Sequence, residues 1–164
     1  MSLQQEIWKY VKLILIGIVA GLILRFVLQI CVVSGLSMYP TLEDADTFIG
    51  INRIFTILER GDIVTVDMSA KGYGTNDLLV KRIIAIPGDH IKIVNHDVYL
   101  NDELLKENYI NENYDYQVTG VIDYKLKDDQ YFVMGDNRGN STDSRFFGPV
   151  NKNDILLEYL FPLF

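Results

Sequence analysis

Leu78-Leu79-Val80-Lys81-Arg82-Ile83-Ile84-Ala85-Ile86 is the strongest strand signal in the chain, and a Pro-Gly-Asp turn at 87–89 ends it. Apolar side chains alternating with a period of two predict a β-strand. Past the apolar N-terminal segment no stretch of convincing length has helical periodicity. The sequence therefore predicts a mainly β domain, with further strands over 48–51, 63–66, 91–94, 97–100, 103–105, 130–134 and 154–160.

Turns and two polar stretches separate these strands. Asn101-Asp102 predicts a tight hairpin turn between the strands on either side of it. Residues 109–124 are polar and aromatic, which favours a surface excursion, and 135–148 reads as a long polar loop.

Lys81 is the one polar side chain on an otherwise apolar face of the 78–86 strand. The alternation places Leu79, Ile83 and Ala85 on that face and Arg82 on the opposite one. Lys81 is then either a protective charge on an edge strand or a buried amine. Burial lowers a lysine pKa because the charged form loses its hydration. Arg82 needs an acidic partner.

An apolar segment, residues 8–28, precedes the strands, and its only charges are Lys9, Lys12 and Arg25. Its length suits a hydrocarbon layer of ~30 Å, so we expect a transmembrane helix. The basic residues before the span favour a cytoplasmic N-terminus. A cleaved signal peptide is the alternative, but no small-x-small cleavage site follows the apolar core. The expected division is an anchor with a short cytoplasmic stub, 1–30, and a β-rich domain outside the cytoplasm, 31–164.

The charge balance excludes some partners. The net charge is −7, and because the first 36 residues are slightly basic, the β-rich part is strongly acidic. Phosphates would repel such a surface, so we expect no nucleic acid partner. Attachment to anionic lipid would have to be hydrophobic. The single Cys31 is interpreted as a small hydrophobe, and two histidines with one distant cysteine make a poor metal site.

Ser37 lies between Gly35 and Pro40, directly after the apolar segment. A serine hydroxyl is a weak nucleophile until a neighbouring base takes its proton. The two histidines, His90 and His96, are both expected in exposed turns. Lys81 is the alternative base, provided that burial keeps it neutral.

The stretch from Gly135 to Arg145 gathers short polar side chains, two carboxylates and two arginines. It is either a solvated surface loop or a rigid frame in which a hydroxyl orients the lysine and ion pairs hold the loop.

Taken together, these segments resemble the bacterial type I signal peptidases, membrane-bound serine proteases that remove signal peptides from exported proteins. The resemblance covers nearly the whole chain, and the order of the motifs makes it specific. The matching motifs are Ser-Met-x-Pro-Thr-Leu at 37–42, Arg-Gly-Asp-Ile-Val at 60–64, Lys-Arg-Ile-Ile-Ala-Ile-Pro-Gly-Asp at 81–89, and Gly-Asp-Asn-Arg to Asp-Ser-Arg within 135–145.

The resemblance implies a role for each matching residue. Ser37 is the expected nucleophile and Lys81 the general base, and Ser141 is expected to hydrogen-bond the lysine. Asp143 and Arg145 match a structural ion pair. A second pair, Arg82 with Asp136, is expected beside it.

Gly35 marks a departure from part of the family. In the Gram-negative branch this position, two before the nucleophile, is a serine whose hydroxyl helps to bind the oxyanion. With Gly35 the Ser37 N–H remains one donor, and the second is the backbone near Gly35 or is absent. The short chain with one anchor is similar to the compact Gram-positive form.

The family also implies a fold, a location and partners. The fold is a set of antiparallel sheets whose exposed apolar surface dips into the bilayer. The expected substrates are signal peptides of preproteins, extended and with small residues at the first and third positions before the cut. We expect a monomer of the cell membrane, single-pass, with the catalytic domain on the extracellular side and neither cofactor nor metal.

Two other functions fit parts of the sequence. An inactive, membrane-tethered relative would bind signal peptides without cutting them, although both Ser37 and Lys81 are present. A self-cleaving repressor-type protease shares a Ser/Lys core but is soluble, which the apolar segment disfavours.

Overall fold

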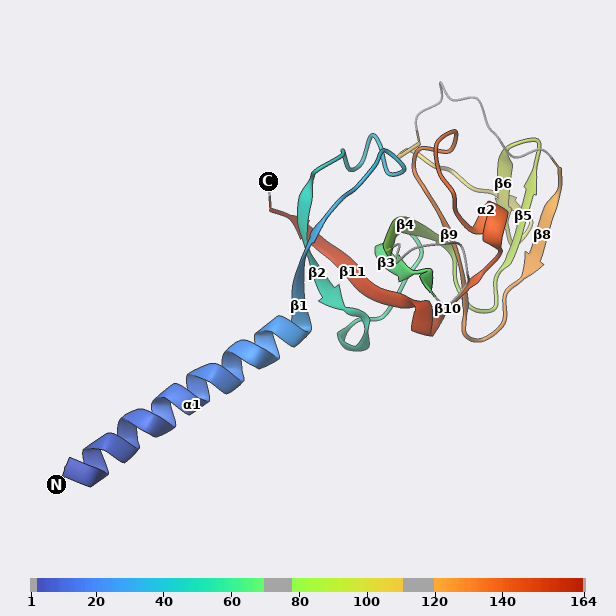
Figure 1. Ribbon diagram of the computed structural model, residues 1–164. Coiled ribbons are helices and arrows are strands. Elements are labelled where there is room, and N and C mark those ends of the chain that lie inside the picture. Colours follow the sequence, from blue (N-terminus) through green and yellow to red (C-terminus); the bar gives the residue numbers. More distant parts are fainter. Residues whose placement is uncertain (1–2, 70–77, 111–119, 164) are drawn as a thin grey trace.

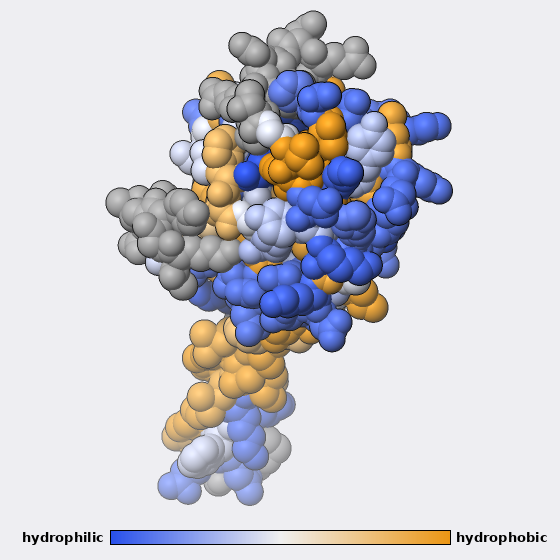
Figure 2. Space-filling model, turned by 90° about the vertical axis from the view of Figure 1, so that its right-hand side faces the viewer, coloured by the Kyte–Doolittle hydropathy of each residue, from blue (hydrophilic) through white to orange (hydrophobic). Residues whose placement is uncertain are grey.

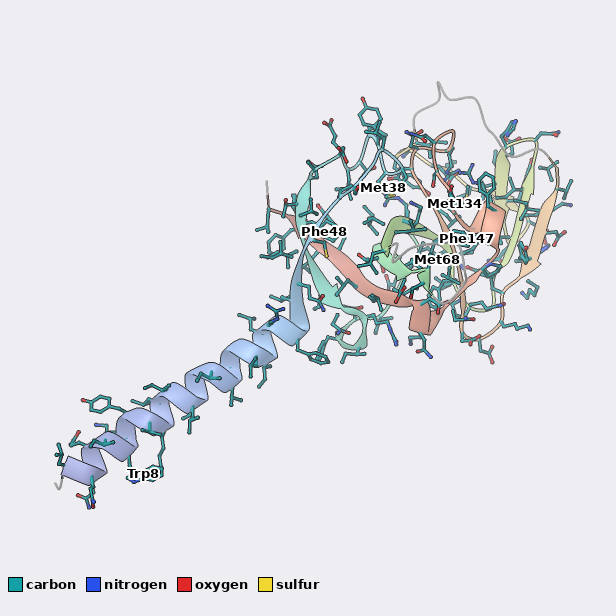
Figure 3. The ribbon with its side chains drawn as sticks, in the orientation of Figure 1. Trp8, Met38, Phe48, Met68, Met134 and Phe147 are labelled. Atoms are coloured by element: carbon teal, nitrogen blue, oxygen red, sulfur yellow. The ribbon has the colours of Figure 1, made fainter. Side chains whose placement is uncertain are left out.

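The computed structural model describes residues 3–69, 78–110 and 120–163, and it separates a long N-terminal helix from a β domain (Figure 1). Helix α1 (Leu3–Val27) has no buried residue. By length and composition it is the one helix in the described ranges that could cross a membrane. Figure 2 shows a hydrophobic band on the helix between the domain and the hydrophilic N-terminal end. Trp8 lies near the end of the helix remote from the domain (Figure 3).

Strand β1 (Leu28–Val32) follows α1 without a linker. The chain is thus extended from Leu28 onward. The last helical turn contacts the domain through Phe26, whose ring meets Phe55 edge-on with 6.0 Å between ring centroids. The end of the helix is thereby placed beside the β1–β2 edge of the domain (Figure 1).

The larger sheet has seven strands, all paired antiparallel, which confirms the predicted fold class. Strand β4 (Leu78–Ala85), which carries Lys81, lies between β3 and β9 and has no free edge. The interpretation of Lys81 as an edge-strand charge is therefore wrong. The strand order is β1, β2 (Thr47–Asn52), β11 (Ile155–Pro162), β3 (Ile63–Asp67), β4, β9 (Gln130–Met134) and β10 (Val150–Asn151).

The smaller sheet lies on the side of the domain away from α1 (Figure 1). Its order is β7 (Glu103–Leu104), β6 (Asp97–Leu100), β5 (His90–Val94) and β8 (Ile122–Lys125). Asn101 and Asp102 have φ values of 53° and 70°, and two consecutive positive values are the mark of a type I′ turn. The predicted hairpin is confirmed.

The structure corrects the expected excursion over 109–124. Its last residues belong to β8, which pairs with the edge of β5 that β6 leaves open. Ile122 packs on the core and the ring of Tyr124 contacts that of Phe132, whereas Asp123 and Lys125 are exposed. The strand is only four residues long, so its alternation is too short to stand out from the polar stretch before it. The part of the excursion over 111–119 lies outside the described residues.

The alternation along β4 holds from Leu79 to Ile83 and then breaks. The pairing of β4 with β9 shifts register between Ile83 and Ala85. As a result, Ile84 and Ala85 both pack in the cluster beneath the small sheet, whereas Ile83 packs in another. The prediction that Ala85 shares the face of Ile83 is wrong, because a strand irregularity resets the side-chain alternation.

Three short helical segments lie wholly within the described residues. They are η1 (Arg53–Phe55), η3 (Lys152–Asp154) and α2 (Ser144–Phe147), the last inside the expected 135–148 loop.

Candidate active site

The turn that carries Ser37 is fixed by apolar side chains on both sides of it. Met38 is fully buried, and it packs with Val33, Leu42 and Phe48 in one cluster. Met38 and Phe48 both lie inside the domain (Figure 3). Gly35 has a φ of +92°, which residues with a side chain rarely adopt, so the turn requires glycine there. Ser37 itself stays half-buried beside its anchored neighbour.

Lys81 approaches Ser37 from β4. Its Nζ lies 2.7 Å from Ser37 Oγ and 2.9 Å from the Val80 carbonyl oxygen. Only 2% of Lys81 is exposed. Burial lowers the pKa of Lys81 to about 8; the Asp143 carboxylate opposes this shift and the Arg145 guanidinium adds to it. With this pKa about a tenth of the amine is neutral at pH 7, against well under a thousandth for an ordinary lysine, so Lys81 can accept a proton far more readily.

The loop after β9 covers the lysine and is not a solvated surface loop. Asp136, Arg138 and Asp143 are all buried. The predicted Asp143–Arg145 pair is confirmed: Nε lies 2.8 Å from Oδ1 and Nη2 lies 2.9 Å from Oδ2. Asp143 also accepts from the backbone N–H of Gly135, at 3.0 Å. The Asp143 carboxylate thus links the beginning and the end of the loop, at Gly135 and Arg145, beside the site.

Ser141 differs from the expectation that it hydrogen-bonds the lysine. Its hydroxyl donates to Asp143 Oδ2, at 2.7 Å. Among the residues that the structure describes, Lys81 Nζ bonds to Ser37 and Val80 and not to Ser141. The hydroxyl donates its hydrogen bond to the carboxylate because a charged acceptor forms the stronger hydrogen bond.

Asp136 joins the turn that carries Ser37 to the strand that carries Lys81. The predicted Arg82–Asp136 pair is confirmed, with Nε 2.8 Å from Oδ1 and Nη2 2.6 Å from Oδ2. Thr41, in the same turn as Ser37, donates its hydroxyl to Asp136 Oδ2 at 2.5 Å. The Arg82 guanidinium also lies over the ring of Tyr109, 4.2 Å from its centroid. This network holds Ser37 and Lys81 in one frame.

Gly35 takes up the turn expected of it, but its N–H is already bonded. It donates to Asp44 Oδ1 at 2.7 Å. In this structure the Gly35 N–H is therefore occupied by a carboxylate.

Two residues that touch the nucleophile turn were missed by sequence reasoning. Asn137 donates from Nδ2 to the Leu36 carbonyl at 2.9 Å and from its N–H to the Ser37 carbonyl at 3.0 Å. Gly135 faces the same carbonyl so closely that a Cβ would lie 2.4 Å from it. Both lie in the loop that the sequence analysis singled out, but nothing in the order of residues says which loop atoms meet the turn.

The histidines lie elsewhere. His90 is the first residue of β5, not a turn residue as expected, and its Nε2 lies 2.8 Å from Asp123 on β8. His96 is exposed in the β5–β6 turn. In the described part of the chain no group of three or more His, Cys, Asp or Glu residues could hold a metal ion.

These features together can do the chemistry of a serine hydrolase whose base is a lysine. A hydroxyl contacts a buried amine, a rigid carboxylate frame surrounds them, and an apolar helix precedes the domain.

The comparisons with known proteins agree with this class. The family model "Signal peptidase, peptidase S26" matches residues 7–164. Signal peptidase I S of Bacillus subtilis is 36% identical over 88% of this chain and 81% of its own length. A probable signal peptidase I-1 of Synechocystis is 33% identical over 96% of this chain and 84% of its own. A crystal structure of a signal peptidase I from Enterococcus faecalis is 26% identical, with a TM-score of 0.49 over 61% of this chain and 94% of its own.

The chain belongs to the signal peptidase family, peptidase S26. It is a signal peptidase I, a serine endopeptidase, and its N-terminal apolar helix is consistent with a single-pass membrane anchor.

Proposed function

We propose that Ser37 is the nucleophile and Lys81 the general base with which this chain cleaves signal peptides from exported preproteins. The observation that carries the proposal is the 2.7 Å contact between Lys81 Nζ and Ser37 Oγ, made by an amine that is 2% exposed. The distance lies within the range for direct proton transfer between a nucleophile and its base.

The reaction has two halves. Neutral Lys81 takes the Oγ proton while Oγ attacks the scissile carbonyl carbon, and the carbonyl oxygen becomes an oxyanion. The C–N bond then breaks, and Lys81 gives its proton to the departing amine. In the second half Lys81 takes a proton from water, the resulting hydroxide attacks the acyl ester, and Ser37 leaves with the proton.

The substrate is an extended peptide with small side chains at the first and third positions before the cut. An extended chain that adds to a strand edge is bound by backbone hydrogen bonds, and shallow pockets then select small side chains. We also assign the supporting frame of this site to Asp143, Arg145 and Ser141, with Gly35 allowing the turn that presents Ser37.

The proposed topology places residues 1–30 as a cytoplasmic stub and anchor, and 31–164 as a monomeric catalytic domain on the extracellular side. Lys9 and Lys12 precede the apolar span and Arg25 follows it, which favours an N-terminus inside. Protease added outside intact spheroplasts should digest the domain, whereas in inverted vesicles the domain should be protected. The reverse pattern would contradict this orientation.

Processing of a model preprotein in membranes tests the catalytic pair. Ser37→Ala and Lys81→Ala should each abolish cleavage, while Ser34→Ala and Lys92→Ala should retain it, since neither control residue contacts the site's hydroxyl or amine. Near-normal turnover by Lys81→Ala would refute the pair. A wild-type protein that binds signal peptides without cutting them would instead be the inactive relative.

A further inference from the structure

The backbone on each side of the Ser37 N–H is held by one buried residue, Asn137. Its side chain donates to the Leu36 carbonyl and its N–H to the Ser37 carbonyl, at 2.9 Å and 3.0 Å. Asn137 follows β9 in the loop after Met134, whereas Leu36 and Ser37 belong to the turn after β1. The contact therefore spans two segments about 100 residues apart and does not come from local turn geometry.

The bond to Leu36 determines where the Ser37 N–H points. The Leu36 carbonyl and the Ser37 N–H belong to one planar trans peptide unit, so they point in opposite directions. When Asn137 fixes the carbonyl, it fixes the N–H as well. Among the described residues no acceptor lies on the Ser37 N–H, whereas the Gly35 N–H donates to Asp44. The Ser37 N–H is thus unpaired among the described residues and is held in one direction. The Gly35 N–H, by contrast, is bonded to a carboxylate.

The side chain of Asn137 is held in this orientation at a cost. Only 4% of the residue is exposed, and among the residues that the structure describes its Oδ1 has no hydrogen-bond partner. Leaving a buried acceptor unpaired costs about 1–3 kcal/mol. Reversing the amide would satisfy neither group, because it would set two acceptor oxygens against each other at the Leu36 carbonyl. The orientation of the Asn137 side-chain amide is therefore determined by its hydrogen bond to the Leu36 carbonyl.

We propose that Asn137 is the positioning residue of the oxyanion site: by holding the Leu36 and Ser37 carbonyls it aims the Ser37 N–H at the oxygen that becomes negatively charged. It touches neither the substrate nor the amine of Lys81. The inference rests on the proposed role of Ser37 as nucleophile. A donor pre-aligned toward the developing charge stabilises the transition state more than the bound substrate.

Asn137→Asp and Asn137→Ala test the proposal in the full chain in detergent micelles. Both remove the Nδ2 donor and keep the backbone N–H. Loss of a single oxyanion donor costs about 100–1,000-fold in kcat, so a misaimed donor should cost about 10–100-fold. KM should stay within about twofold, and the pH midpoint of the Lys81 limb should not move. The matched control is Asn140→Ala, an exposed asparagine of the same loop, with unchanged kcat.

A peptide boronic acid separates this role from a merely structural one. Its trigonal boron forms a covalent bond with Ser37 Oγ, and the resulting tetrahedral anion resembles the reaction intermediate. Its affinity should fall in the variants by the same factor as kcat/KM. Unchanged affinity despite a lower kcat, a shifted pH limb, or full activity in both variants would each overturn the proposal.

If the variants do not fold, a measurement on the wild-type protein still tests the proposal. The Ser37 amide proton, observed by ¹⁵N NMR, should move downfield when the boronic acid binds, because the N–H then donates to an anion. An unmoved Ser37 amide would refute the inference. If instead the wild-type enzyme has no turnover, or Ser37→Ala keeps it, the proposed function fails and not the role of Asn137 alone.

Discussion

Gly135 presses against the carbonyl of Ser37 so closely that a Cβ built on it would lie 2.4 Å from that oxygen and 2.3 Å from Ser141 Oγ. The loop after β9 therefore meets the nucleophile turn backbone to backbone. Because Gly135 is buried, and the turn is held by the buried Met38 and by hydrogen bonds to the loop, the site has little room to adjust.

Gly135→Ala should displace the turn from Lys81. A shift of about 1 Å in a catalytic group can cost about 100-fold in rate, so we expect at least this loss in kcat/KM. Overpacking should also lower the free energy of unfolding by about 1–3 kcal/mol. Gly17→Ala is the control, since a Cβ there meets nothing within 4 Å. An active Gly135→Ala enzyme would show that the loop and turn can separate freely.

Asp143 and Arg145 should move the pH dependence of cleavage in opposite directions. The Asp143 carboxylate raises the pKa of Lys81 and the Arg145 guanidinium lowers it. Asp143→Asn should therefore shift the limb on which kcat/KM rises with pH to lower pH, and Arg145→Met should shift this rising limb to higher pH. Shifts in the same direction would mean that the pair acts on Lys81 through structure and not through charge.

Lys81 should lower stability at neutral pH. Its pKa of about 8 lies below the value of about 10.4 in an unfolded chain, so between these pH values the unfolded state binds more protons. The contribution of this group to stability thus rises with pH across that window, by on the order of 3 kcal/mol. Lys81→Met should be the more stable protein at pH 7, and its advantage should shrink toward pH 10. Denaturant unfolding in detergent at several pH values measures this, and a constant difference would contradict it.

Arg82→Met should destabilise the domain strongly. It leaves Asp136, which is fully buried, without its cation, and uncompensated buried charge costs about 3–5 kcal/mol. The matched variant is Arg60→Met, whose partner Asp89 keeps donors from Ile86 and Asn101. Because Arg60 is partly exposed, its loss should lower the free energy of unfolding by only about 1 kcal/mol. Equal losses in the two variants would contradict this difference.

The sequence predicted most strands and singled out Ser37 and Lys81, which the fold brings into contact, because both leave local signals. Alternation marked β4, and Lys81 interrupted it. The turn residues Asn101 and Asp102 marked the hairpin. Strand β8 was missed because it forms by pairing with an open edge and has only four residues, of which Ile122 and Tyr124 contact the core.

The partners of the loop side chains could not be predicted in the same way. Ser141 matched a position expected to hold the lysine, but its hydroxyl turns to Asp143. Asn137 and Gly135 contact a turn about 100 residues earlier, and such contacts are set by packing in three dimensions. The charge pairs were partly predictable, because a buried arginine must meet a carboxylate.

The pH dependence of kcat/KM for a model preprotein tests the Ser37–Lys81 pair most directly. Cleavage requires neutral Lys81, so the rate should rise with pH and level off above a single midpoint near 8. Ser37→Ala should show no such limb. A midpoint near 10.4, the value of a solvated lysine, or a rate independent of pH between 6 and 10, would contradict the assignment of Lys81 as the base.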